Sequence, residues 1–137
     1  MDVKTTFLNG EIEEEVYIEQ PEDFETCERK SHVCQLKKAL HGLKQAPRAW
    51  YGRIDSYLQR MGFVKSDADP NLYYLLVEDE PLVLVLYVDD LFLTGSSRLI
   101  MDCKRNLEVE FDMKDLGLMH YFLGLEVCQK NGDIFMG

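Results

Sequence analysis

Two adjacent aspartates, Asp89 and Asp90, are the residues whose type and spacing most directly suggest chemistry. An unbroken apolar run, Leu82 to Val88, precedes them, and a second one, Leu91 to Leu93, follows. Such a run is typical of a strand covered on both faces, and Asp is common in tight turns, so we expect the pair at a β-hairpin tip. Carboxylates held together there repel each other, which raises the pKa of at least one unless a cation shares the site.

The expected cation is Mg²⁺ or Mn²⁺, because these ions favour sites made only of oxygen ligands and rich in carboxylates. Two such ions a few ångström apart support in-line phosphoryl transfer. The simpler interpretation is a solvated Asp-Asp turn, since hairpin tips are often rich in Asp. The dipeptide by itself favours the simpler interpretation, so the choice depends on the rest of the chain.

Charge is divided unevenly along the 137 residues. The net charge of −10 argues against a nucleic-acid partner, because phosphates bind Lys and Arg. Residues 1–28, however, hold ten acids and one Lys, whereas residues 29–54 hold seven Lys or Arg and no acid. The basic segment is typical of a phosphate-contacting surface inside an acidic protein, and a solvated helix face has the same composition.

Length and hydrophobicity favour one globular domain with a single core, because 46% of the 137 residues are hydrophobic. The longest apolar run falls far short of the roughly 20 residues that span a bilayer. The acidic N-terminal segment also differs from a secretory signal, so we expect an intracellular protein that has no membrane partner.

Two helices must position the aspartates, and both show an apolar stripe at the helical period. The spacing of Trp50, Ile54 and Leu58 after Pro47 predicts a helix near 47–61. Ile100, Cys103 and Leu107 predict a second helix near 97–111, capped by Ser96 or Ser97.

The remaining pattern is that of strands and turns. The predicted strands are 2–7, 16–18, 33–36, 72–77, 82–88, 91–95, 121–127 and 133–136. A loop opens at Pro21, and Asn131-Gly132 is a turn signal. The sequence therefore predicts an α+β fold, an antiparallel sheet with two helices on one face.

Four ordered motifs resemble those of the reverse transcriptases of Ty1/copia-type retrotransposons. They are DVKTTFLNG at 2–10, LKQAPR at 43–48 with Trp50-Tyr51, YVDD at 87–90, and FDMKDLG at 111–117 followed by FLG at 122–124. The resemblance implies a polymerase palm truncated at the N-terminus. Residues 1–137 would be a partial reverse transcriptase domain whose fingers are incomplete, with thumb and RNase H absent.

Within that resemblance, Asp2, Asp89 and Asp90 would be the catalytic residues and would hold two Mg²⁺ (or Mn²⁺) ions. Phe7 would abut the sugar of the incoming nucleotide and exclude a ribose 2′-hydroxyl. Its alternative role is that of a core Phe beside a turn.

Other substrate contacts are implied by the same motifs. Lys44 and Gln45 would lie beside the nucleotide and template, and Arg48 would contact phosphate or cap the helix. Lys114 would protonate pyrophosphate, or is a surface lysine in a loop. The segment Phe122, Leu123 and Gly124 would lie under the primer end, or is a strand kink.

The implied partners are an RNA template, a DNA primer, dNTP and the remainder of the Pol polyprotein with its fingers, thumb and RNase H. The implied location is the cytoplasm, in a virus-like particle, or the nucleus. His41 stands where the family more often has Tyr, which leaves the role of that position open.

Only Met1 precedes Asp2, so the strand that delivers this carboxylate is expected to be weakly held and the isolated fragment inactive. The alternative function is a non-catalytic retroelement remnant that acts as an acidic binding module or has no function.

Overall fold

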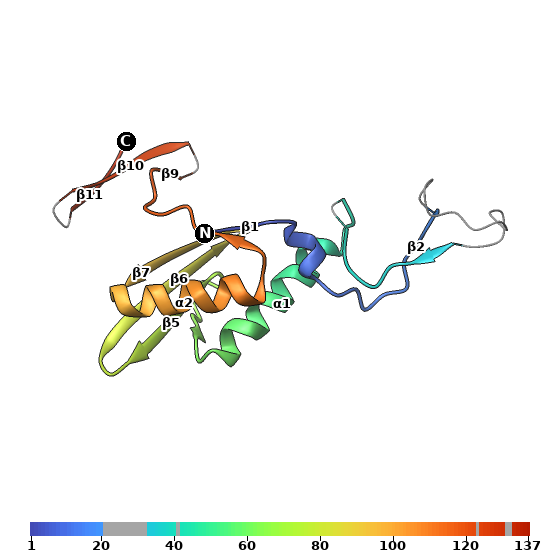
Figure 1. The fold of residues 1–137 in the computed structure, drawn as a ribbon, viewed down its shortest axis with the longest axis horizontal. Coiled ribbons are helices and arrows are strands. Elements are labelled where there is room, and N and C mark those ends of the chain that lie inside the picture. The colour runs from blue at the N-terminus through green and yellow to red at the C-terminus, as the bar shows by residue number, and fades with distance from the viewer. Residues whose placement is uncertain (21–32, 41, 123, 131–132) are drawn as a thin grey trace.

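The computed structural model of the protein describes residues 1–20, 33–40, 42–122, 124–130 and 133–137. Its centre is a six-stranded antiparallel sheet in the order β4-β5-β6-β7-β1-β8 (Figure 1). The strands in this order are Val64–Lys65, Leu72–Val77, Glu80–Tyr87, Asp90–Gly95, Asp2–Val3 and Met113–Lys114. The first residues of the chain therefore form an interior strand.

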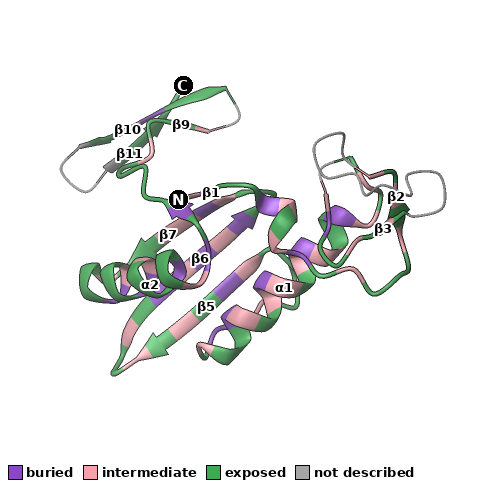
Figure 2. Ribbon diagram, turned by 45° about the vertical axis from the view of Figure 1, so that its right-hand side comes forward, coloured by how far each residue is buried: buried purple, intermediate pink, exposed green. Residues whose placement is uncertain are grey.

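Two helices, α1 (Ala46–Arg60) and α2 (Ser97–Glu110), cover the same face of this sheet (Figure 2). They also contact each other. The Tyr57 hydroxyl donates a hydrogen bond to the carbonyl oxygen of Asn106 at 3.1 Å, and the Arg53 guanidinium pairs with the Glu110 carboxylate. The predicted α+β fold with both helices on one face is confirmed.

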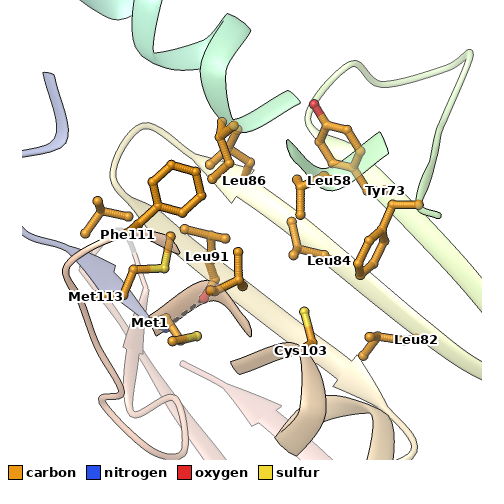
Figure 3. Packing of buried hydrophobic residues seen from close by; sticks show 14 of the residues in the cluster. Met1, Leu58, Tyr73, Leu82, Leu84, Leu86, Leu91, Cys103, Phe111 and Met113 are labelled. Carbon is orange, nitrogen blue, oxygen red and sulfur yellow. Dashed lines mark hydrogen bonds between the residues drawn. The ribbon is translucent and has the colours of Figure 1, made fainter. Parts of the chain in front are cut away.

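The core lies between the helices and the sheet, and alternation along β6 defines it. Leu82, Leu84 and Leu86 are buried, whereas Val83 and Val85 point to the other face and are half-buried. The prediction that this strand is covered on both faces is therefore wrong, because the helices pack on one face only. Figure 3 shows the buried cluster, in which both helices and the first strand take part. It includes Met1, Val3, Trp50, Ile54, Leu58, Tyr73, Leu91, Cys103, Leu107 and Phe111.

Both long hairpins turn over two residues, and neither turn lies quite where the sequence predicted it. The β5–β6 turn is Glu78–Asp79, with φ of 51° and 65°, and the strand resumes at Glu80. In the β6–β7 hairpin Tyr87 pairs with Asp90, so the turn residues are Val88 and Asp89. Asp90 is thus the first residue of β7 and not part of the tip.

The smaller elements lie outside the main sheet. The expected strand over 2–7 is shorter, because Thr5 has a φ of 47° and a 3₁₀ helix, η1 (Thr6–Asn9), begins after it. Strand β2 (Tyr17–Ile18) pairs with β3 (Cys34–Gln35) beyond α1. Strand β10 (Leu125–Lys130) lies between β9 (Tyr121–Phe122) and β11 (Asp133–Met136).

Some predictions on local structure are corrected or fall outside the described residues. Ser96 is the N-cap residue of α2, one of the two predicted, but its hydroxyl donates to the Glu80 carboxylate at 2.8 Å and makes no side-chain cap on the helix. The loop from Pro21 and the Asn131-Gly132 turn lie outside the described residues. Within the part that is described, neither helix is long and apolar enough to cross a bilayer.

Candidate metal and nucleotide site

The pairing of β1 with β7 brings two of the predicted aspartates face to face. Met1 and Leu91 exchange two hydrogen bonds of 2.8 Å between their main-chain groups, so the next pair, Asp2 and Asp90, is a non-hydrogen-bonded pair. In such a pair the Cα atoms are about 4.5 Å apart and both side chains leave the same face of the sheet. Since Met1 and Leu91 are buried beneath the helices, Asp2 and Asp90 lie on the opposite, open face.

Asp89 joins this pair through the main chain of β1. The backbone N–H of Val3 donates a hydrogen bond of 3.0 Å to the carbonyl oxygen of Asp89. Asp89 is exposed at the turn and directly precedes Asp90. The three predicted carboxylates therefore come from two distant segments that hydrogen bonds hold side by side.

Electrostatics at Asp90 follow from this arrangement. Burial raises the pKa of Asp90 above its usual range, the charges of Asp89 and Asp2 raise it further, and the Met1 amino group opposes them. Like charges directly opposite each other on a sheet are destabilising, and a cation between them would relieve the repulsion.

The donor set suits a hard divalent cation, because Asp2, Asp89 and Asp90 offer only carboxylate oxygens. Among the residues that the structure describes, no three His, Cys, Asp or Glu side chains converge closely enough to enclose an ion. Asp2, Asp89 and Asp90 nevertheless fit Mg²⁺ or Mn²⁺, because they offer oxygen ligands and lie on neighbouring strands. Their carboxylates would have to turn toward one another to bind the ion.

The turn that carries Asp89 is strained. Val88 has a φ of 53°, a conformation that costs a β-branched residue roughly 1–3 kcal/mol. The indole N–H of Trp50, from α1, donates a hydrogen bond of 2.7 Å to the carbonyl oxygen of Val88. Sequence reasoning placed Trp50 only in the core stripe and in a motif, because this contact joins segments far apart in the chain and has no local sequence signal.

Lys114 lies beside the aspartates. It pairs with Asp2 on the side of β1 away from β7, and its neighbour Met113 is buried in the core. Because residues paired across strands share a face, Asp90, Asp2 and Lys114 form a row across the open face. The sequence placed Lys114 at the site only by resemblance.

The predicted nucleotide and template residues lie around the first turn of α1. Lys44 is exposed just before the helix, and Gln45 is its N-cap residue. Gln45 and the exposed Arg48 line a hollow of about 790 Å³, whose lining also includes the acidic side chains of Glu11 and Glu13. Part of the basic segment thus faces acidic residues of the N-terminal segment. The uneven distribution of charge along the sequence is consistent with such a contact.

Phe7 also belongs to this neighbourhood. It lies in η1, is half-buried and packs against the edge of the core. The segment after η1 approaches α1 very closely at Gly10, where a Cβ atom would lie 2.8 Å from both the Ala49 Cβ and the backbone nitrogen of Trp50. The segment after Asp2 is therefore packed tightly onto α1.

The predicted primer segment lies against the open face of the sheet. The Phe122 ring makes edge contacts with Phe92 and Tyr87, at centroid distances of 4.8 and 6.0 Å. Gly124 has a φ of 82°, which favours glycine, and Leu123 lies outside the described residues. Phe122 thus covers part of the face from which Asp90 and Tyr87 project.

Comparison with known proteins identifies the family. Residues 1–136 match the family described as "Reverse transcriptase (RNA-dependent DNA polymerase)". The chain is 45% identical over 132 residues to a retrovirus-related Pol polyprotein from transposon TNT 1-94 of Nicotiana tabacum, which covers 95% of the chain. It is 42% identical over 127 residues, 92% of the chain, to the Pol polyprotein from transposon RE1 of Arabidopsis thaliana.

A third relative is a putative Ty5-1 transposon protein of Saccharomyces cerevisiae, 39% identical over 136 residues and 98% of the chain. The chain spans 10% and 9% of the two plant polyproteins and 44% of the yeast protein. No solved structure matches it. The chain belongs to the reverse transcriptase (RNA-dependent DNA polymerase) family and is of the Ty1/copia type.

Proposed function

We propose that this chain is the catalytic palm of an RNA-directed DNA polymerase, in which Asp2, Asp89 and Asp90 hold two Mg²⁺ or Mn²⁺ ions. The reaction would join a dNTP to a primer 3′-hydroxyl on an RNA template during retrotransposition. The single observation that carries the proposal is the pairing of Asp2 with Asp90 beside the Asp89 turn.

The ions would activate the hydroxyl and neutralise the charge that develops on the attacking and leaving oxygens. The protein's own contribution would be to hold Asp2 and Asp90 on one face of the sheet, next to the exposed turn that carries Asp89. Burial, and then repulsion from Asp89 and Asp2, raises the pKa of Asp90 in the metal-free chain, and a bound cation would relieve that repulsion. The open face of the sheet beside them is where a primer and template duplex would lie.

Other residues would position the substrates. Phe7 would exclude a ribose 2′-hydroxyl, and Lys44, Gln45 and Arg48 would contact nucleotide and template from the start of α1. Their common location around the first turn of that helix supports this assignment.

The remaining assignments concern the pyrophosphate that leaves and the primer end that is extended. Lys114 would donate a proton to the departing pyrophosphate, which its place beside Asp2 supports. Phe122, Leu123 and Gly124 would support the primer end, and the contact of Phe122 with Tyr87 next to the Asp89 turn is consistent with this role.

The chain spans a small part of the Pol polyproteins that it resembles, so the whole activity is proposed for a longer protein. The remaining partners would be the fingers, thumb and RNase H of the same polyprotein, in a cytoplasmic particle or in the nucleus. Residues 1–137 alone should show little synthesis, because contacts from fingers and thumb would be missing and the net charge of −10 opposes binding of a duplex.

The test is primer extension with Mg²⁺ or Mn²⁺ by a version of the chain extended upstream through the fingers and downstream through the thumb. Asp89→Asn in that protein should abolish synthesis while the fold stays intact, because it removes a metal ligand and relieves repulsion. Near-normal extension by Asp89→Asn would remove Asp89 from the site. Failure of the unsubstituted long protein to extend any primer would favour a non-catalytic remnant.

A further inference from the structure

Both carbonyl groups of the Val88–Asp89 turn accept hydrogen bonds from outside their own hairpin. The carbonyl oxygen of Asp89 accepts from the backbone of Val3, and that of Val88 accepts from the Trp50 indole at 2.7 Å. The turn is thus held by β1 on one side and by α1 on the other.

The Val88 side chain cannot hold the turn by packing, because it is 56% exposed. A φ of 53° is nevertheless a conformation that Val rarely adopts without external support. The indole is well suited to supply that support. Trp50 is only 2% exposed, and its ring contacts Phe111 edge-on at 5.4 Å.

The backbone at Trp50 is fixed as well. The close approach of Gly10 ties the start of α1 to the segment that follows β1. Helix α1 therefore contacts both segments that carry carboxylates. Its Trp50 indole bonds to the Val88 turn, and its backbone packs against Gly10 in the segment that follows Asp2.

We infer that Trp50 is a positioning residue of the polymerase site: its indole N–H holds Val88 at positive φ and so sets the direction of the Asp89 carboxylate. This inference rests on the proposed function. It predicts that the indole N–H, and not the bulk of the ring, determines activity.

The first test removes the N–H and keeps an aromatic ring. Trp50→Phe in the long polymerase should lower kcat for primer extension about tenfold, the effect of losing one well-placed hydrogen bond, with little change in KM for dNTP. The matched control is Tyr57→Phe, which removes a donor from the same helix but leaves the turn untouched. Equal kcat in the two variants would overturn the inference.

The second test asks for rescue. Glycine adopts positive φ without support, so Val88→Gly should restore kcat in the Trp50→Phe background. A role of Trp50 in core packing alone predicts no rescue, because Val88→Gly fills no space near the ring. Absence of rescue in a folded double variant would therefore contradict the inference.

A third readout needs neither activity nor metal. In nuclear magnetic resonance spectra of residues 1–137, Val88 should give the strong intraresidue Hα–HN Overhauser effect typical of positive φ, and Trp50→Phe should weaken it. Trp50 is the single Trp of the chain, so its indole N–H is readily assigned and should exchange slowly with solvent. Rapid exchange in the unsubstituted chain would overturn the inference even if Trp50→Phe fails to fold.

The same experiments separate this inference from the proposed function. If Asp89→Asn abolishes extension and Trp50→Phe does not alter it, the metal site stands and the role of Trp50 falls. If Asp89→Asn leaves extension intact, the proposed function falls, whereas the state of the Val88 turn is still read from the spectra.

Discussion

At the scale of single residues, the carboxylates of Asp2 and Asp90 are the ones that the fold places against each other. The pKa of Asp90 is raised by burial and by its two acidic neighbours. Below the ordinary pKa of Asp, the side chain is protonated in the folded and unfolded states and has no effect on stability. As the pH rises through the interval up to the raised pKa, the folded state holds more protons and loses stability relative to the unfolded state.

Asp90→Asn should therefore stabilise the metal-free chain at neutral pH, by about 0.5 kcal/mol for a relieved cross-strand repulsion. The gain should vanish on acidification below the ordinary Asp range. Urea unfolding at a series of pH values measures it, with Asp67→Asn, in the exposed loop before β5, as the control. A gain independent of pH would show that charge is not its cause.

How far the sequence reveals the site differs from residue to residue. The adjacency of Asp89 and Asp90 predicts their repulsion directly. Only a family resemblance predicts that Asp2 lies across the sheet from Asp90, because the register between distant strands has no local signal. Both aspartates were expected at the hairpin tip, but the turn residues are Val88 and Asp89 and the positive φ falls on Val88, because the pairing of Tyr87 with Asp90 decides which residues turn.

At the scale of elements, periodic sequences were the most informative. The stripe through Trp50, Ile54 and Leu58 predicted α1 to within a residue at each end, because burial of one helix face leaves a clear 3.6-residue period. The sequence predicted the position of strand 82–88 closely, but it did not predict that only one face of this strand is covered by helices. An apolar run does not reveal whether its second face is covered by a helix or left half-open.

The junction of β7 with α2 offers a test of the fold at this scale. Gly95 has a φ of 139°, and a Cβ atom there would overlap the carbonyl oxygen of Pro81 on β6. Gly95→Ala should lower the free energy of unfolding by about 3 kcal/mol, because backbone strain and overlap add. Gly52→Ala is the matched control: its Cβ meets nothing within 4 Å in α1, so it should stabilise by roughly 0.5–1 kcal/mol.

Denaturant unfolding of the two variants checks this prediction. The opposite order, with Gly52→Ala the more destabilised, would contradict the packing of β6 against the end of β7.

At the scale of the whole molecule, the sheet order accounts for how the ends of the sequence contribute to one site. Strand β1 lies between β7 and β8, so Asp2 is held on both sides. This differs from the expectation that the strand is weakly held because it follows Met1. The charge pattern is also partly neutralised in the fold, since Arg53 of the basic segment pairs with Glu110.

We propose that Asp2, Asp89 and Asp90 share divalent ions in a polymerase palm. The most direct test is a crystal structure of the long version of the chain with primer, template, dNTP and Mn²⁺, in which anomalous scattering locates the metal. We predict two manganese ions bound by these three carboxylates on the open face of the sheet. Manganese bound by other residues, with Asp2 outside contact distance, would show that the three carboxylates do not form the metal site.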